Sequence, residues 1–230
     1  MSAAGPARSF VSCIVGALAL AGALACDVGA PGTFPPEDPQ LAEANASTGD
    51  PHRGRFPFEL AVAGLPESGQ LRATITTDSG AIRCRLFADV SPLAVANFVG
   101  LARGERPFYD PNLGSWTTRP YYDGLSFHRA QERVFVQGGR LGEDESVGFV
   151  LQDERSIGTR FDKSGVLALG NRGPNTSAAQ FFITTELAPS LDGDYTILGR
   201  CEDLLVVREL EARVLAGERP IIESVGITRE

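Results

Sequence analysis

The stretch Ser126 to Gly139, SFHRAQERVFVQGG, and the stretch Gly170 to Ile183, GNRGPNTSAAQFFI, decide how the rest of this sequence is interpreted. Both combine arginine, amide side chains, aromatic residues and glycines. Neither contains a nucleophile beside a base, a set of metal ligands, or the Gly-Lys-Ser/Thr ending of a phosphate-binding loop. This inventory suits a reaction in which no covalent bond is broken.

Several short motifs in and around these stretches resemble those of the cyclophilin-type peptidyl-prolyl cis-trans isomerases. They follow the family's order: Phe127-His128-Arg129, Gln137-Gly138-Gly139, Gly173 to Thr176, Gln180 to Ile183, and Leu191-Asp192-Gly193. The resemblance covers about Leu71 to Thr228, and the long loop from Arg103 to Tyr122 is similar to that of bacterial members. It implies isomerisation of X-Pro bonds in proline-containing polypeptides, without a cofactor or a metal.

The residue pattern also predicts a mostly β domain over residues 67–230. Leu71 to Thr77 and Ala81 to Phe87 are rich in β-formers and flank the turn Asp78-Ser79-Gly80, which favours a hairpin. Two helices are predicted, at Ser91 to Gly104 and at Asp203 to Leu215. Further strands are predicted at Val134 to Gln137, Gly165 to Leu169, Gln180 to Thr184, Tyr195 to Gly199 and Ile221 to Thr228. Many short strands with two helices indicate a closed or nearly closed β architecture. The resemblance implies a closed, eight-stranded antiparallel barrel with two capping helices.

The resemblance assigns catalysis to Arg129. Rotation about a peptide bond crosses roughly 18–20 kcal/mol, because resonance gives the C–N bond partial double-bond character. In the family, the guanidinium of this arginine bonds the prolyl carbonyl and can approach the prolyl nitrogen as that resonance is lost. The alternative for Arg129 is a surface ion pair with Asp123 or Glu132.

The resemblance also assigns the substrate-binding residues. They are Gln137, Gly170, Asn171 and Gln180 along the peptide, and Val134, Phe135, Phe182, Leu191 and Tyr195 around the proline ring. Amide side chains suit the first role, because each can hold both an N–H and a C=O of an extended peptide. Neighbours on a strand point to opposite faces, so one of Phe181 and Phe182 faces the core, and the family pattern places Phe182 on the pocket side.

The sequence departs from the family pattern at four positions. Relatives usually have Phe at Val134 and Met at Phe135, so the aromatic is displaced by one residue unless the strand register slips. Ser190 replaces a tryptophan, which predicts weak binding of cyclosporin. Arg172 replaces a small residue, which predicts a preference for acidic residues before the proline. These changes leave a rival hypothesis, a proline-peptide binding module that isomerises slowly.

The N-terminal region predicts export. Residues 1–25 resemble a signal peptide, with Arg8 before the uncharged apolar run Phe10 to Ala25, which is shorter than the roughly 20 residues of a membrane span. Cys26 follows at the position of a lipoprotein acceptor; ordinary secretion and an uncleaved anchor are the alternatives. Residues 26–66 are rich in Pro, Gly, Ala and acidic residues, which predicts a flexible tether. The predicted location is the periplasm or cell envelope.

Charge and cysteine content limit the remaining possibilities. The net charge of −8 argues against binding to nucleic acid or to the anionic surface of a membrane. The predicted contact with a membrane is therefore a lipid on Cys26. We expect the protein to be a monomer. Cys84 and Cys201 are the cysteines beyond the predicted signal and its edge. We expect them to be small buried residues in separate strands; a disulfide between them is the alternative that export permits.

Overall fold

The structure is a computed structural model that describes residues 34–142, 146–155 and 159–230. The predicted signal peptide, Cys26 and the first residues of the predicted tether lie outside these ranges. Within them, no helix is both long and apolar enough to cross a membrane.

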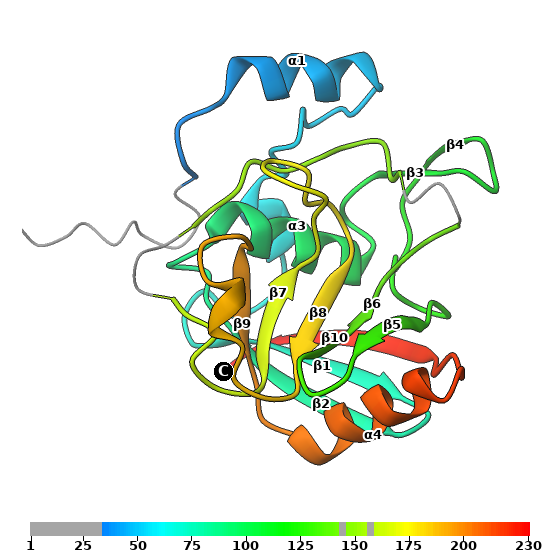
Figure 1. The fold of residues 1–230 in the computed structure, drawn as a ribbon. Helices are drawn as coiled ribbons and strands as arrows, with labels where there is room; N and C mark the ends of the chain where they lie inside the picture. The colour runs from blue at the N-terminus through cyan, green and yellow to red at the C-terminus, as the bar shows by residue number, and fades with distance from the viewer. Residues whose placement is uncertain (1–33, 143–145, 156–158) are drawn as a thin grey trace, which may run out of the picture.

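The described part of the chain builds one curled antiparallel sheet of eight strands, in the order β10-β1-β2-β9-β7-β8-β6-β5 (Figure 1). The strands are β1 (Leu71–Thr77), β2 (Gly80–Leu86), β5 (Phe127–Gln131), β6 (Phe135–Gly138), β7 (Val166–Leu169), β8 (Phe181–Thr184), β9 (Ile197–Cys201) and β10 (Ile222–Arg229). A small hairpin, β3 (Phe108–Asp110) with β4 (Ser115–Thr117), stands apart from this sheet.

The expected closed barrel is replaced by an open, curled sheet. Its edge strands β5 and β10 form no ladder within the described residues; they approach each other at an isolated bridge between Ser126 and Ile221. The preceding residue, Pro220, accepts a hydrogen bond from the Phe127 N–H but has no N–H to donate. A regular ladder therefore does not extend past this point.

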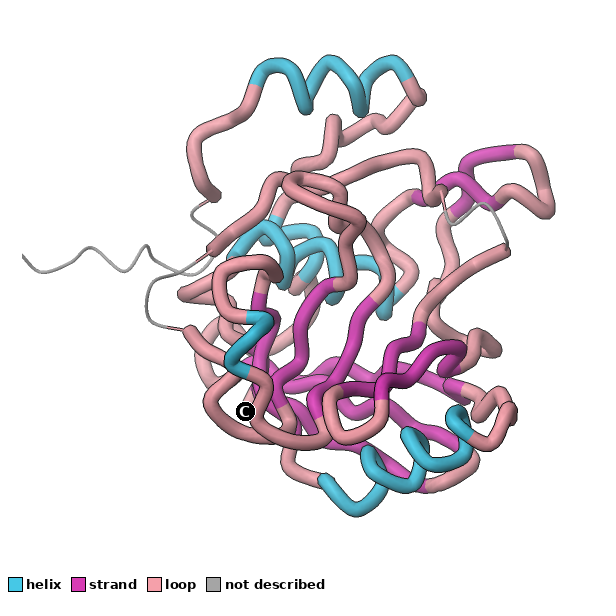
Figure 2. Tube along the Cα trace, in the orientation of Figure 1, coloured by secondary structure: helices cyan, strands magenta, loops and turns pink. Residues whose placement is uncertain are grey.

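The two expected helices cover opposite ends of the sheet (Figures 1 and 2). Helix α3 (Pro92–Arg103) has proline in its first turn and ends at Gly104, whose φ of 74° is the left-handed conformation that glycine adopts without strain. Helix α4 (Leu204–Leu215) buries Val207, Leu210 and Val214 against the sheet. The short turn η1 (Pro189–Leu191) lies between β8 and β9.

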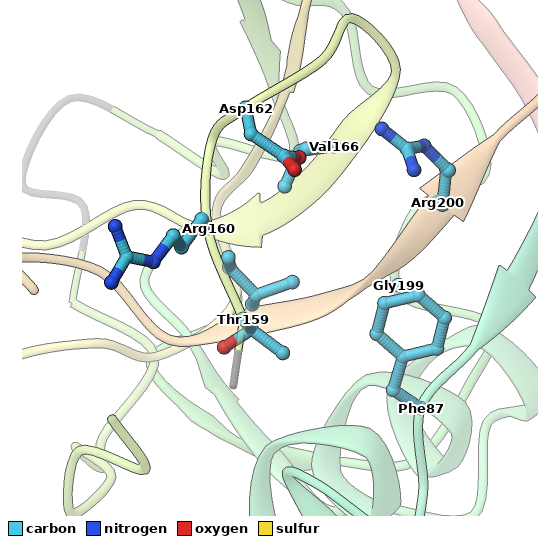
Figure 3. Close-up of a pocket in the computed structure, with 8 residues that line it drawn as sticks. Phe87, Thr159, Arg160, Asp162, Val166, Gly199 and Arg200 are labelled. Atoms are coloured by element: carbon cyan, nitrogen blue, oxygen red, sulfur yellow. The ribbon is translucent and has the colours of Figure 1, made fainter. Parts of the chain in front are cut away.

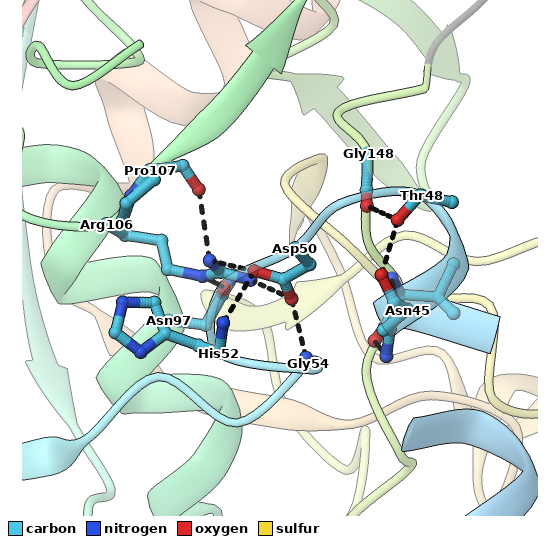
Figure 4. A network of polar contacts seen from close by, with 10 residues as sticks. Asn45, Thr48, Asp50, His52, Gly54, Asn97, Arg106, Pro107 and Gly148 are labelled. Atoms are coloured by element: carbon cyan, nitrogen blue, oxygen red, sulfur yellow. Dashed lines mark hydrogen bonds and ion pairs between the residues drawn. The ribbon is translucent and has the colours of Figure 1, made fainter. Parts of the chain in front are cut away.

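Residues 34–66 correct the prediction of a flexible tether. They form helix α1 (Pro39–Ser47) and helix α2 (Phe58–Ala61) and pack onto the domain. Asp38 caps α1 by accepting hydrogen bonds from two backbone N–H groups. Asp50 forms an ion pair with Arg106, in which both side chains are 0% exposed (Figure 4). The Pro-, Gly- and acid-rich composition misled the prediction, because this segment is held by polar contacts together with a few apolar side chains, such as Phe56 and Phe58, that enter the main core.

Cys84 and Cys201 form a disulfide, so the expectation of two separate buried cysteines was wrong. The sheet order makes β2 and β9 neighbours, and their register places the two residues opposite each other with Cα atoms 3.9 Å apart. The bond joins residues 117 positions apart in the sequence. This pairing depends on long-range strand order, which a single sequence does not reveal.

Candidate active site

One row of residues crosses four adjacent strands on the outer face of the sheet. In the strand register, Arg129 on β5 pairs with Gln137 on β6, Gln137 pairs with Phe182 on β8, and Phe182 pairs with Ala168 on β7. Residues directly opposite each other in neighbouring strands share a face. The register therefore brings the predicted catalytic arginine, a predicted amide and the predicted pocket floor onto one surface.

The strand alternation at Phe181 and Phe182 is the one expected. Phe181 is 0% exposed in the main core, between the sheet and α3, where it makes an edge-to-face contact with Phe98. Phe182 belongs to a second cluster on the opposite face of the sheet. The backbone of β8 thus sends one ring into the core and the other toward the site.

The second cluster surrounds Phe182 with aromatic rings. The centroid of the Phe182 ring lies 5.3 Å from that of Phe135, 5.9 Å from that of Phe161 and 5.0 Å from that of Tyr195. Val134 and Leu191 are partly buried against the same cluster. All five predicted proline-pocket residues therefore gather here. Phe161, which sequence reasoning missed, stacks on Phe182 from the loop before β7; its signal was an isolated aromatic in a polar loop.

The strand register at Val134 and Phe135 needs no slip. Phe135 is two residues before Gln137 and shares its face, and it contacts Phe182 directly. Val134 precedes the strand and reaches the edge of the cluster. Phe135 therefore contributes an aromatic ring beside Phe182, at the position where the family pattern has Met.

Arg129 is exposed and lies above this cluster. Its Cζ is 5.1 Å from the centroid of the Phe135 ring, and its Nη1 donates a hydrogen bond to Gln137 Oε1 at 3.4 Å. Among the residues that the structure describes, it forms no ion pair with Asp123 or Glu132, which were the alternative partners. The guanidinium therefore stands at the border between an apolar surface and solvent.

The predicted amides continue the site beside Arg129. Gln137 Nε2 donates to Gln180 Oε1 at 2.8 Å, which orients both side chains. A Cβ on Gly170 would lie 3.3 Å from Gln137 Nε2, so glycine leaves room for this pair. Asn171 donates to the Asp194 carbonyl at 2.7 Å and accepts from the Gly173 N–H at 3.2 Å. The side chain of Asn171 therefore stabilises the loop around residues 171–173, and the backbone groups of Asn171 are the ones placed to bind a peptide.

Arg129 and the predicted amides line a cleft of about 670 Å³, whereas the five proline-pocket residues around Phe182 are not among the described residues that line it. The cleft includes the predicted residues Arg129, Gln137, Gly170, Asn171 and Gln180. Among its other lining residues, only Arg172 was given a binding role from the sequence. The remaining lining residues are Tyr121, His128, Arg140, Ser146, Phe149, Val150, Thr176, Ala178, Ala179 and Arg219. Across the described ranges, four arginines and no carboxylate line this cleft, in a protein whose net charge is −8.

A second, smaller pocket of about 250 Å³ adjoins the aromatic cluster (Figure 3). It shares Val166 and Ile197 with that cluster and is bordered by Arg160, Asp162 and Arg200. No predicted site residue lines it. Within the described residues, no group of three or more His, Cys, Asp or Glu side chains could hold a metal ion.

Comparison with known proteins identifies the family. Residues 72–229 match the family model "Cyclophilin type peptidyl-prolyl cis-trans isomerase/CLD". Peptidyl-prolyl cis-trans isomerase A of Mycobacterium tuberculosis is 37% identical over 166 residues, which cover 68% of this chain and 91% of the relative. Peptidyl-prolyl cis-trans isomerase B of Streptomyces anulatus is 39% identical over 132 residues, which cover 56% and 75%.

A solved structure agrees with these matches. The crystal structure of a cyclophilin-type peptidyl-prolyl cis-trans isomerase of Cryptosporidium parvum superposes with a TM-score of 0.57 at 27% identity, covering 70% of this chain and 99% of that one. A second structure of that protein, in the presence of the dipeptide Ala-Pro, gives a TM-score of 0.55 at 26% identity, covering 69% and 99%. On this evidence the chain belongs to the cyclophilin family and is a peptidyl-prolyl cis-trans isomerase.

Proposed function

We propose that this isomerase acts on X-Pro bonds of exported polypeptides, with Arg129 as its catalytic residue and the aromatic cluster as its proline pocket. The cross-strand row of Arg129, Gln137 and Phe182 is the observation that supports this most directly. Adjacent strands lie about 4.8 Å apart, so the row spans roughly 10 Å from the cation to the pocket floor. That span suits one prolyl residue and its flanking peptide bond.

The chemistry asked of the site is modest. An uncatalysed prolyl bond isomerises in roughly 10–100 s, so a turnover near 10³ per second needs about 7 kcal/mol of selective transition-state stabilisation. In the twisted state the prolyl nitrogen regains its lone pair. The guanidinium of Arg129 favours that state over the planar ground state, because it donates to electron density that the planar amide lacks.

The surrounding groups hold the peptide while the bond rotates. Phe135 and Phe182 offer an apolar surface to the ring of proline, and the paired amides of Gln137 and Gln180 present donors and acceptors to an extended backbone. Fixing one side of the bond turns thermal rotation of the other side into productive turnover. The site requires no cofactor for this reaction.

Two features support an exported protein. The N-terminal 25 residues have the composition of a signal peptide, and Cys26 stands where a lipoprotein would be acylated. The Cys84–Cys201 disulfide is the kind of bond that persists in oxidising compartments such as the bacterial periplasm. The proposed location is therefore the cell envelope, where a monomeric enzyme is held by a lipid on Cys26.

A slow, peptide-binding variant of the family is the second candidate, favoured by Val134 at the rim of the pocket. Exchange NMR of a short unstructured proline peptide with the purified protein and its Arg129→Ala variant distinguishes the two. We expect fast exchange that falls by about 10²–10³-fold in the variant, the usual cost of one transition-state donor. Peptide binding without acceleration by the unmodified protein would instead establish a binding module.

A further inference from the structure

The N-terminal strap, defined as residues 34–56, lies outside the residues that the family model matches. It crosses one side of the substrate cleft. The segment it crosses, residues 146–151, supplies Ser146, Phe149 and Val150 to the lining of the cleft and is here named the cleft wall. The wall also has backbone hydrogen bonds to Tyr109 and Ser177, and its apolar side chains pack into the main core; the strap adds a further set of contacts at Gly148 and Val150.

Asn45 on helix α1 contacts the cleft wall through both ends of its amide. Its Nδ2 donates to the Val150 carbonyl at 2.9 Å, and its Oδ1 accepts from the Val150 N–H at 2.8 Å. The residue is 2% exposed, so both bonds are made away from solvent. One side chain thus satisfies both backbone groups of Val150, as a neighbouring β-strand would, and fixes where this residue of the wall lies.

Two further contacts hold the strap against the same point. Thr48 Oγ1 donates to the Gly148 carbonyl (Figure 4). Gly54 passes so close that a Cβ there would lie 2.3 Å from Asn45 Nδ2 and 2.7 Å from the Val150 carbonyl oxygen. The strap therefore packs tightly against the two hydrogen bonds between Asn45 and Val150.

The buried ion pair ties this arrangement to the rest of the domain. Asp50 accepts two hydrogen bonds from the Arg106 guanidinium, at 2.7 and 2.8 Å. The Arg106 Cζ lies 3.9 Å from the centroid of the Phe149 ring, on the cleft wall. One arginine therefore contacts the strap and the wall together.

From these contacts we infer that Asn45 is a positioning residue for the substrate cleft. It acts through Val150 and sets the width of the cleft opposite the row that contains Arg129. The inference rests on this cleft being the substrate site. It also assigns a task to an N-terminal segment that lies outside the residues matched by the family model.

The test compares Asn45→Ala with Asp38→Ala in the purified protein. Asp38 accepts hydrogen bonds from the backbone N–H groups of Gln40 and Leu41 and so caps α1, but it does not contact the wall. We expect Asn45→Ala to raise KM for a proline peptide about five- to tenfold with kcat within about twofold, because it removes two buried hydrogen bonds behind the wall. Asp38→Ala should leave both constants unchanged. Asn45→Asp retains the acceptor for the Val150 N–H but sets a buried carboxylate oxygen against the Val150 carbonyl, so it should not recover the loss.

The only tryptophan of the chain gives a readout that does not depend on turnover. The ring of Trp116 lies 3.1 Å from where a Cβ on Gly49 of the strap would be, and 2.8 Å from the corresponding position on Gly148 of the wall. Its fluorescence emission should shift in Asn45→Ala and remain unchanged in Arg129→Ala.

Two results would overturn the inference. One is a wild-type KM and an unshifted emission in Asn45→Ala. The other is an equal rise of KM in Asp38→Ala, which would mean that stability of the strap alone governs the cleft. Absence of turnover in the unmodified protein would count against the proposed function instead. In that case the Kd for a proline peptide, measured by NMR titration, would replace KM in the comparison of Asn45→Ala with Asp38→Ala.

Discussion

Removing the disulfide between Cys84 and Cys201 should cost a large part of the folding stability. The bond closes a loop of 117 residues. In the chain-entropy account, a crosslink over this length lowers the entropy of the unfolded chain by about 16 cal/mol/K, which corresponds to about 5 kcal/mol at 25 °C. Domains are typically stable by roughly 5–15 kcal/mol. The protein without the bond should therefore be marginally stable.

Urea unfolding of the double variant Cys84→Ala/Cys201→Ala, followed by circular dichroism and by Trp116 fluorescence, measures this cost. The expected result is a midpoint far below that of the oxidised wild type, with a free energy of unfolding lower by about 5 kcal/mol. Wild type in reductant should approach the variant, and reductant should not change the variant itself. A difference below about 1 kcal/mol would refute the argument that closure of this loop stabilises the fold.

Three further outcomes are expected. Asp50→Asn leaves Arg106 as an uncompensated buried charge and should destabilise the protein by about 3–5 kcal/mol in urea unfolding, whereas an effect under about 1 kcal/mol would contradict the described ion pair. Arg172→Ala should reduce the ratio of kcat/KM for Glu-Pro over Lys-Pro peptides, because it removes one of the arginines of the cleft; unchanged selectivity would count against that role. Burial raises the pKa of Glu154 to about 7, from 4.5 in the unfolded chain, and outweighs two hydrogen bonds from the first turn of α3 that lower it. Between these two pH values the folded state holds a proton that the unfolded state has released, so stability should fall as pH rises from about 4.5 to 7. Glu154→Gln should flatten that part of a curve of Tm against pH. An unchanged curve in the variant would exclude Glu154 as the source.

Strand-level features of the site were predictable from the sequence. Strand alternation and the family motifs predicted that Phe182 faces the pocket, and the register places Arg129, Gln137 and Phe182 in one row. The glycine that ends α3 and the proline that begins it likewise marked the bounds of that helix. These features depend on local backbone geometry, which neighbouring residues determine.

Features that depend on distant residues were not predictable in the same way. The partner of Cys84 is set by which strands lie side by side, and the partner of Asp50 is Arg106, 56 positions later in the sequence. The strap lacks an apolar period because most of its contacts are a cap, an amide pair and an ion pair, and its few apolar contacts, such as Phe34 and Phe56, lie near its two ends. The local signals of packing were the aromatic residues at and just beyond its end, Phe56 and Phe58; the polar contacts of Asn45 and Asp50 had no such signal.

The position of the disulfide also determines what a protease could release from this protein. Every predicted catalytic and peptide-binding residue, from Arg129 to Tyr195, lies between Cys84 and Cys201 and so within one covalent ring. A single cut in any loop of that ring leaves both fragments joined through the sulfur atoms, with their paired strands still in register. A protein nicked once within the ring would thus keep these predicted site residues covalently joined, and only a second cut inside the ring could detach any of them.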